Sequence, residues 1–292
     1  LDLNSGGMDW NEGDEAVMAE QDYGAMLNHF KFVARRYGVV NRMVSIPNHP
    51  KDDDELVELY ASAITDKTRL LMICHMVNIT GQILPVRKIC DMAHSRGVEV
   101  MVDGAHAYSH INFQMEDLDC DYYGTSLHKW LSAPLGSGML YVRKEKINDV
   151  WPLLAAGDVA SDDIRRLGHT GTDPSHVDLG ILNAIDYQKA LGLTRKEARL
   201  KYLQNYWTSQ LRDVSGVSVN TPADMSRHGG IGNVGVDGMD PRDLADTLFQ
   251  EHRIFTAGVD RPGVRGVRVT PNIYTTLEEL DALVTAVREI SS

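Results

Sequence analysis

The stretch TRLLMICHMVNITGQILPVRKICDMAHSRGVEVMVD, residues 68–103, contains two apolar runs separated by a segment with helix signals. The apolar runs, residues 68–77 and 98–103, have too few polar positions to leave one face in water, so we expect buried strands. Between them, Pro85 opens and Gly97 closes a segment typical of a helix. A buried strand, a helix and a second buried strand predict a mostly parallel sheet.

The same alternation continues on both sides of this stretch. Strands are expected at residues 14–21, 41–47 and 120–126, and helices at residues 23–38 and 53–64. When continuous apolar strands alternate with helices, the helices cover both faces of the sheet that the strands form. We therefore predict an α/β large domain over residues 1–192, with helices on both faces of a mostly parallel sheet.

The rest of the chain predicts a smaller domain. Two long helices are expected at residues 174–192 and 194–214, the second of which would connect the domains. After them we expect short strands and helices, with strands at residues 217–220, 230–236, 253–258 and 267–271 and helices at residues 240–252 and 276–290. This pattern indicates a compact α+β domain over residues 193–292.

Composition excludes several classes of protein. With 292 residues and 43% apolar residues, the chain can bury a sizeable core. The 41 acidic residues outnumber the 29 basic ones, and no run of Lys and Arg with interleaved aromatic residues occurs. A surface for nucleic acid or an anionic membrane is therefore not expected.

Cysteine usage and the absence of export signals indicate the compartment. Cys74, Cys90 and Cys120 are odd in number and lack paired spacing, so they form neither a disulfide framework nor a CxxC metal site. No apolar run is long enough to span a bilayer, and the first residues do not resemble a secretory signal. We expect a cytoplasmic protein, provided that Leu1 is close to its natural beginning.

Polar residues follow three of the expected strands at their carboxyl ends. They are Asn78, Asp103, His106, Ser126, His128 and Lys129. In open α/β sheets, ligands bind beyond the carboxyl ends of the strands. We therefore expect an amide, a carboxylate, a hydroxyl, two imidazoles and an amine to meet in one site.

A lone lysine and a lone aspartate in such a site suit one cofactor. A partly desolvated lysine can form a Schiff base with a carbonyl compound, and pyridoxal phosphate is a carbonyl cofactor whose pyridine nitrogen needs a carboxylate partner. Lys129 would then form the Schiff base, and Asp103 would keep the ring nitrogen protonated. Ser126 and His128 would contact the phosphate, and His106 would reach the phenolic oxygen.

Each of these residues also has a simpler interpretation. Taken alone, Lys129 is typical of a solvated loop lysine, and Asp103 could cap a following helix. His106 and His110 are four residues apart beside an acid, which is the spacing of metal ligands on a helix, but no third ligand is evident. We therefore expect no metal.

Two longer stretches carry a resemblance to a known family. VMVDGAHAYSH at residues 100–110 and DCDYYGTSLHKWLSAPLGSGMLYVRKE at residues 119–145 resemble the cofactor-binding region of the class V aminotransferase family, which consists of fold-type-I pyridoxal-phosphate enzymes. Residues 74–97 and VRVTPNIYTTLEELDAL at residues 267–283 most resemble its isopenicillin N epimerase-like branch. The motifs occur in the family's order from about Met8 to the C-terminus.

The resemblance implies roles for individual residues. Lys129 matches the Schiff-base lysine and Asp103 the partner of the pyridine nitrogen. Asn78 and His106 match neighbours of the phenolic oxygen. Ser126 and His128 match phosphate ligands.

The resemblance also implies a substrate-binding residue and a homodimer. Arg268, which alone could be an ordinary strand arginine, matches a residue whose planar guanidinium binds the carboxylate of an amino acid with two hydrogen bonds. Gly171 and Thr172 match a loop that crosses a dimer interface and touches the cofactor phosphate of the partner subunit. A homodimer with its site at the interface is therefore expected.

The reaction itself stays open at this point. From the carbanion at the substrate α-carbon, transamination, epimerisation and β-elimination are all accessible. We expect an aminotransferase or epimerase-like enzyme acting on an amino acid or amine, with a pyridoxal-phosphate-dependent C–S β-lyase as the alternative. A non-catalytic, partner-binding relic would have lost Lys129 or Asp103. A cysteine desulfurase is not expected, because residues 256–266, where such relatives carry a mobile cysteine, contain none.

The beginning of the chain departs from the family pattern. In the family, a long stretch separates the sequence that resembles residues 1–7 from the sequence that resembles residues 8–27. This stretch contains the helix N-terminus that binds the cofactor phosphate and the aromatic or His residue that stacks on the ring. Here Met8 follows Gly7 directly. We expect that a segment the size of a small domain belongs between Gly7 and Met8 and that these residues were joined across it; the alternative is a true deletion that cripples cofactor binding.

Overall fold

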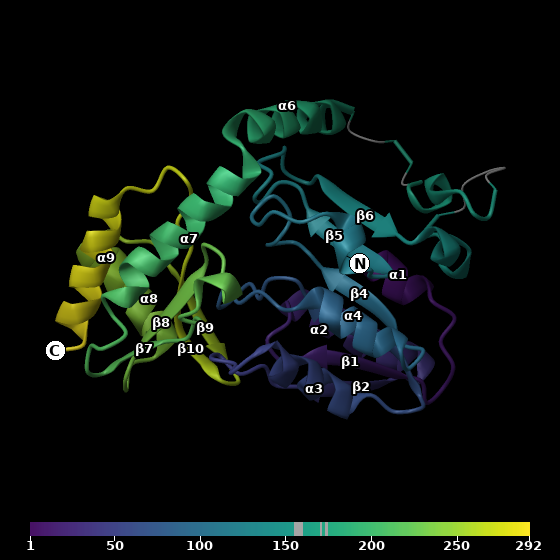
Figure 1. Cartoon of the computed structure of the whole chain (residues 1–292), viewed down its shortest axis with the longest axis horizontal. Coiled ribbons are helices and arrows are strands. Elements are labelled where there is room, and N and C mark those ends of the chain that lie inside the picture. Colours follow the sequence, from purple (N-terminus) through teal and green to yellow (C-terminus); the bar gives the residue numbers. More distant parts are fainter. Residues whose placement is uncertain (155–159, 170, 173–174) are drawn as a thin grey trace.

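The computed structural model describes all residues except 155–159, 170 and 173–174. Figure 1 shows a large sheet formed by the first half of the chain and a smaller sheet formed by the C-terminal part. Helix α6 (Ser175–Leu191) lies over the edge of the large domain, and α7 (Leu193–Ser209) runs from there to the small sheet. Gly192, with φ of 84°, separates these two helices. The domain boundary at residues 192 and 193, which coincides with this turn, stays a prediction.

The large sheet has six strands in the order β2-β1-β3-β4-β5-β6. The strands are β1 (Glu15–Ala19), β2 (Val40–Val44), β3 (Thr68–Cys74), β4 (Glu99–Asp103), β5 (Tyr122–Ser126) and β6 (Gly138–Val142). The first five strands in this order pair in parallel, and β6 pairs antiparallel to β5 at one edge. This arrangement confirms the mostly parallel α/β sheet predicted from the sequence.

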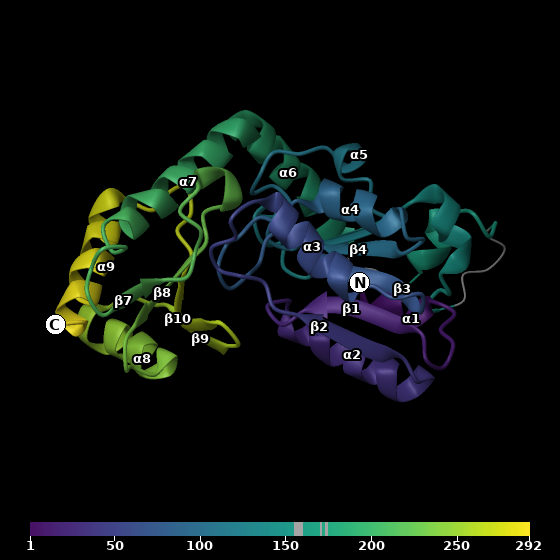
Figure 2. The same cartoon turned by 60° about the horizontal axis from the view of Figure 1, so that its bottom comes forward.

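Helices cover both faces of the large sheet. Val17 and Ile73 face one side, where they pack with helices α3 (Asp53–Ala63) and α4 (Val86–His94). Met18, which alternates with Val17, faces the other side and packs with α2 (Gly24–Tyr37). Figure 2 shows α2 on one side of the sheet and α3 and α4 on the other. Strands buried on both faces explain why their sequences are apolar without alternation.

Local signals in the sequence explain where these helices begin and end. Asp52 starts α3 by accepting a hydrogen bond from the backbone N–H of Glu55 at 2.9 Å. Gly38 ends α2 in the left-handed conformation, and its N–H donates to the carbonyl of Ala34 at 2.9 Å. The helix bounds therefore lie close to those expected from the sequence.

The small domain has an antiparallel sheet in the order β7-β8-β10-β9. Its elements are β7 (Val217–Val219), β8 (Gly232–Val236), α8 (Pro241–His252), β9 (Ala257–Arg261), β10 (Val264–Val269) and α9 (Leu277–Ile290). Its core joins side chains of α7, α8 and α9 to the strands, with Trp207 fully buried at the centre. The predicted α+β layer is thus present.

The structure differs from the expectations in three places. Residues 253–256 are not a strand, because Arg253 adopts the left-handed conformation that ends α8 and β9 starts only at Ala257. Residues 105–110 form turns, so the alternative in which Asp103 caps a following helix is not supported. β6 and the short helices α1 (Asp2–Gly7) and α5 (Met115–Leu118) were not predicted.

The chain passes directly from α1 into the residues before β1. Gly7 ends α1, and Met8 follows with extended backbone, at φ −76° and ψ 146°. The missing segment expected between Gly7 and Met8 stays a prediction.

Candidate active site

Lys129 lies in the loop that follows β5, at the carboxyl edge of the large sheet. Its backbone N–H donates to the carbonyl of Ser126 at 3.3 Å, which folds the chain back directly after the strand. Its Nζ lies 3.3 Å from Nε2 of His106 and 5.8 Å from the ring centroid of Tyr23. The amine is therefore enclosed by an imidazole and an aromatic ring.

Asp103 is the last residue of β4, next to the strand that leads to Lys129. Because Asp103 pairs with Gly124 of the parallel strand β5, both strands end at the same edge. The carboxyl group is buried, and its Oδ1 accepts a hydrogen bond from the backbone N–H of Ala105 at 3.0 Å. Burial raises the pKa of Asp103, whereas the Ala105 N–H and the charge of Lys129 act to lower it.

The electrostatic surroundings favour the neutral form of two site residues. Burial lowers the pKa of Lys129; the nearby Asp103 opposes this shift, and Arg268 adds to it. Burial holds the pKa of His106 well below its ordinary range, and the positive charges of Lys129 and Arg268 lower it further. An amine with a lowered pKa is a better nucleophile near neutral pH.

Arg268 of the small domain contacts Asn78 of the large domain at this site. Arg268 lies in β10 of the small domain, and its guanidinium donates to the backbone carbonyl of Asn78 at 3.4 Å. Nε of Arg268 and Oδ1 of Asn78 are buried and have no hydrogen-bond partner among the described residues. These two atoms lie where the domains meet, so both are available to a polar ligand that binds there.

Ser126 and His128 flank Lys129 on the same loop. Ser126 ends β5 and is half-buried, and Nδ1 of His128 lies 3.2 Å from the carbonyl oxygen of Ser137. Both side chains stand close to the amine in sequence, but no hydrogen bond among the described residues joins either to Lys129. Their expected contact with a phosphate stays a prediction.

Gly171 and Thr172 are exposed, and no hydrogen bond between described residues links them to Lys129 or Asp103. Gly171 has φ of 92°, a conformation that favours glycine, and no described residue lies within 4 Å of a Cβ added there. This arrangement leaves the two residues accessible to another subunit.

Two residues of the site were missed by the sequence analysis. Asp22 and Tyr23 follow β1, whose carboxyl end meets those of β3 and β4 at the same edge of the sheet. The signal was available, because β1 was an expected strand and its polar residues could have been included with the others. The ring-stacking aromatic residue was expected in the missing segment, yet Tyr23 already places a ring beside Lys129.

Asp22 is the most buried carboxyl group near the site. Its side chain is 3% exposed, and Oδ2 accepts a hydrogen bond from the backbone N–H of Ala19 at 2.7 Å. Burial raises the pKa of Asp22 to about 7, against the effect of this N–H and of the Cys74 thiol, while the charge of Asp103 adds to the rise.

The histidine pair with metal spacing does not share a ligand. Nε2 of His110 accepts a hydrogen bond from the backbone N–H of Gly230 at 2.7 Å, whereas His106 contacts Lys129 and Trp130. Among the described residues, no group of three His, Cys, Asp or Glu side chains lies close enough to hold a metal ion.

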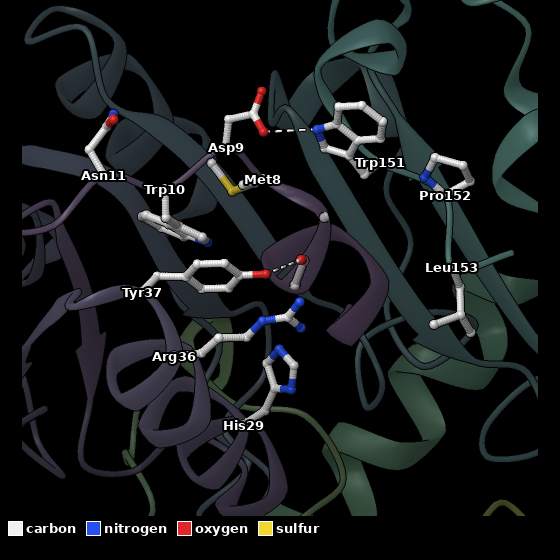
Figure 3. A pocket seen from close by; sticks show the side chains of 12 residues that line it. Met8, Asp9, Trp10, Asn11, His29, Arg36, Tyr37, Trp151, Pro152 and Leu153 are labelled. Carbon is white, nitrogen blue, oxygen red and sulfur yellow. Dashed lines mark hydrogen bonds between the residues drawn. The ribbon is translucent and has the colours of Figure 1, made fainter. Parts of the chain in front are cut away.

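A cavity of about 900 Å³ lies away from this site, next to α1 and α2. Figure 3 shows Trp10 beside Tyr37, and Trp151 donating a hydrogen bond to Asp9. The lining residues are Gly6, Gly7, Met8, Asp9, Trp10, Asn11, His29, Arg36, Tyr37, Trp151, Pro152 and Leu153. None of the residues gathered around Lys129 lines it, so volume alone does not identify the active site.

The polar groups around Lys129 fit pyridoxal phosphate. The site offers an amine of lowered pKa, a buried carboxyl group, an aromatic ring and two buried polar atoms without partners. These are the group types that the cofactor's carbonyl, ring nitrogen, ring face and oxygens require.

In the part of the chain that the structure describes, no helix has both the length and the apolar character needed to cross a bilayer.

Comparison with protein families and sequences gives a consistent result. The family model described as "Aminotransferase class-V" matches residues 3–283. The chain is 32% identical over 296 residues to an isopenicillin N epimerase of Amycolatopsis lactamdurans. The aligned region covers 96% of this chain and 74% of the relative. The chain is 27% identical over 294 residues to a cysteine desulfurase of Haloferax volcanii, with 94% of this chain and 67% of the relative covered.

Solved structures share the fold. A complex between a cystine C–S lyase and its reaction product, cysteine persulfide, superposes with a TM-score of 0.87 at 21% identity, covering 99% of this chain and 78% of that one. An apo cysteine desulfurase from Thermococcus onnurineus gives a TM-score of 0.85 at 23% identity, covering 99% and 76%. At these identities the likeness supports the fold-type-I architecture and nothing finer.

Proposed function

Because the chain belongs to the class V aminotransferase family, whose cofactor is pyridoxal phosphate, we propose that it epimerises or transaminates an amino acid or amine. The observation that carries this proposal is the position of Lys129. Its amine has a lowered pKa and lies beside His106, with the buried carboxyl group of Asp103 close enough to affect its titration. No other chemistry considered above needs these groups together.

Pyridoxal phosphate, when bound, supplies a carbonyl group that an amine can hold covalently and a conjugated ring that withdraws electrons from the substrate α-carbon. Lys129 would hold the carbonyl carbon, and Asp103 would keep the ring nitrogen protonated. Asn78 and His106 would bind the phenolic oxygen, with Oδ1 of Asn78 available because it lacks another partner. Ser126 and His128 would bind the phosphate.

The same residues suggest how a substrate is held and how its proton is moved. Arg268 would bind the substrate carboxylate, since its Nε is buried without a partner between the two domains. Lys129, once exchanged for the substrate amine, would be a free amine of lowered pKa that can take and return a proton at the α-carbon. Burial between the domains would exclude water from that step.

Similarity to named relatives favours epimerisation within this group of reactions. Two isopenicillin N epimerases, from Amycolatopsis lactamdurans and Streptomyces clavuligerus, are 32% and 31% identical to this chain over more than nine tenths of its length. We therefore rank an epimerase-like reaction on an amino-acid centre first, and transamination second.

Cleavage of a C–S bond is the alternative, because relatives in the comparison include cysteine desulfurases. A desulfurase would need a mobile thiolate to accept sulfur. All three thiols are buried, those of Cys74, Cys90 and Cys120, and burial is the main cause of the raised pKa of each. A β-elimination that releases the sulfur-containing fragment directly needs no such thiolate, so the C–S β-lyase is the form that we retain.

We also propose that the active unit is a homodimer. Gly171 and Thr172, which the family resemblance assigns to the partner's phosphate site, are exposed. Helix α6, which lies near them in the sequence, presents the exposed apolar side chains of Leu179 and Leu182. Exposed apolar side chains that gather in this way are typical of a protein interface.

The cofactor assignment is tested by the variant Lys129→Ala. The wild-type chain reconstituted with pyridoxal phosphate should show a visible absorption band, because the covalent link to an amine extends the conjugation of the ring. Lys129→Ala should lose this band and at least about 99% of turnover, with unchanged circular dichroism. The control Lys31→Ala removes an exposed lysine and should keep both. A band that persists with turnover in Lys129→Ala would refute the role of Lys129.

The reaction type is tested by product analysis. The protein is incubated in D2O with single enantiomers of amino acids, and deuterium at the α-carbon is measured by mass spectrometry. A change of handedness with deuterium at the α-carbon identifies epimerisation, an oxo acid with amino-group transfer identifies transamination, and a released thiol with an oxo acid and ammonia identifies β-elimination. Absence of all three outcomes with every amino acid and amine would contradict the proposed function.

A further inference from the structure

We propose that Trp130 is a positioning residue that fixes the tautomer of His106 and thereby keeps the Lys129 amine uncharged. The proposal rests on the proposed function, because it concerns how the same lysine is prepared to react. Trp130 directly follows Lys129 in sequence, and its side chain is buried. Its role depends on one hydrogen bond that determines which nitrogen of His106 carries the proton.

The hydrogen bond between the indole of Trp130 and His106 can have only one direction, with the indole as the donor. Nε1 of Trp130 lies 3.2 Å from Nδ1 of His106. An indole N–H can only donate, so Nδ1 must accept and cannot carry a proton. A neutral His106 therefore carries its proton on Nε2, and the doubly protonated form is excluded while this contact is kept.

The opposite nitrogen of His106 faces the lysine. Nε2 lies 3.3 Å from Nζ of Lys129. Because Nε2 carries the proton, it must donate, and Nζ must accept with a lone pair. An ammonium group has three N–H donors and no acceptor, so only the neutral amine completes this contact. The neutral amine is also the nucleophilic form of lysine.

Trp130 is held in place by groups outside the site. Its ring lies against that of His110, with centroids 3.9 Å apart and planes tilted by 53°. Its backbone carbonyl accepts hydrogen bonds from Nε2 of Gln188 in α6, at 3.2 Å, and from the Lys196 ammonium group in α7. Helices α6 and α7 therefore hold the backbone of Trp130, and the contacts with His106 and His110 orient its indole.

Other groups also act on the charge of Lys129. The charged or titratable groups that bear on Lys129 or on His106 are Asp103 from β4, Cys74 from β3, Arg268 from β10 and His110. Asp103 and Cys74 favour the ammonium form, whereas Arg268 and burial favour the neutral amine. None of these groups is replaced when Trp130 alone is changed to Phe, which removes the indole N–H together with part of the ring volume.

The variant Trp130→Phe tests the proposal in the full chain freed of cofactor. Without the indole donor, His106 can move its proton to Nδ1 and accept from the ammonium group with Nε2. The apparent pKa of Lys129 should therefore rise by roughly half a unit to one unit, the size expected for one hydrogen bond. It is measured as the pH dependence of acetylation of Lys129 by acetic anhydride, read by peptide mass spectrometry.

Trp207→Phe is the matched control. Trp207 is a buried tryptophan of the small domain whose Nε1 has no hydrogen-bond partner among the described residues, so the same loss of volume occurs away from Lys129. Trp207→Phe should leave the apparent pKa of Lys129 unchanged. An unchanged Lys129 pKa in folded Trp130→Phe, or an equal rise in both variants, would overturn the proposal.

A second measurement needs no variant. In wild-type protein with ¹⁵N-labelled histidine, NMR should show His106 protonated on Nε2 and unprotonated on Nδ1 between pH 6 and pH 9. A proton on Nδ1 in that range would overturn the proposal even if Trp130→Phe failed to fold. Neither readout uses cofactor or turnover, so failure here leaves the Lys129→Ala test of the proposed function intact.

Discussion

Asp22 is the residue whose titration should matter most for stability. In the unfolded chain this carboxyl group loses its proton near its ordinary pKa of 3.8, whereas in the folded chain burial raises the pKa to about 7. Between these values the unfolded state binds fewer protons than the folded state, so the free energy of unfolding falls as pH rises through this window. Below pH 4 and above pH 7 the contribution of Asp22 no longer changes with pH.

Replacing Asp22 by Asn should remove this loss of stability. The amide keeps an oxygen for the Ala19 N–H and cannot ionise. Relative to the variant, the wild-type chain should lose about 2–4 kcal/mol of unfolding free energy between pH 4 and pH 8, measured by urea titration at both values. The control Asp246→Asn, at an exposed position, should follow the wild type. Parallel pH profiles for wild type and Asp22→Asn would show that Asp22 ionises normally in the folded state.

At the residue scale, the sequence predicts side chains that carry chemistry better than it predicts their contacts. Lys129 and Asp103 follow apolar strands, and that position is sufficient to place both at one edge of a parallel sheet. The donation from Trp130 to His106 was not predictable, because residues 105–110 form turns whose side-chain directions no periodicity specifies.

At the element scale, the loop between β3 and α4 shows how closely the two domains approach. Gly81 in this loop has φ of 75°, and a Cβ added there would lie 2.0 Å from the carbonyl oxygen of Ile231 in the small domain. Its own carbonyl accepts a hydrogen bond from the backbone N–H of Gly229 at 2.9 Å. The contact is therefore backbone against backbone, and no side chain can move aside to relieve it.

The substitution Gly81→Ala should cost considerably more stability than its backbone conformation alone explains. Gly97 is the matched control, since its φ is 73° but nothing lies within 4 Å of an added Cβ. Gly97→Ala should lose about 1–2 kcal/mol of unfolding free energy through the left-handed conformation. Gly81→Ala should lose roughly twice that or more, measured by guanidinium titration. Equal losses would mean that the domains separate without cost at this loop.

The central strands were predicted, whereas the edge strand β6 was not. β3 and β4 lie in the middle of the sheet, so nearly every side chain is apolar and the pattern is unambiguous. β6 is an edge strand that is only partly buried and follows a loop rich in glycine and proline, and its sequence signal is correspondingly weak. Residues 253–256 carry two apolar side chains but begin with the left-handed Arg253, which the sequence does not reveal.

At the scale of the whole molecule, the exposed face of α6 provides a test of the dimer. Leu179 and Leu182, which are 68% and 62% exposed, are three residues apart and lie on the same side of the helix. If this face contacts a second subunit, Leu182→Asp should raise the dimer dissociation constant by at least about tenfold, because a charge would be buried in an apolar contact.

The measurement is light scattering coupled to gel filtration over a range of protein concentrations. Phe32→Asp, on the 67% exposed Phe32 of α2, introduces the same charge on an equally exposed apolar side chain elsewhere and should leave the dimer intact. A wild-type chain that stays monomeric at all concentrations would contradict the homodimer itself. A Leu182→Asp variant that dimerises like the wild type would place the interface on another face.

All three thiols of the chain belong to one buried cluster of the large domain. Cys74 is in β3, Cys90 in α4, and Cys120 immediately before β5, whereas residues 193–292 contain no cysteine. An alkylating reagent can reach these sulfur atoms only when the large domain opens, so the rate of labelling measures that opening event and is insensitive to fluctuations of the small domain. Labelling rates measured with and without pyridoxal phosphate would thus show how much the cofactor slows the opening of the large domain. This measurement uses the native protein and needs no substitution.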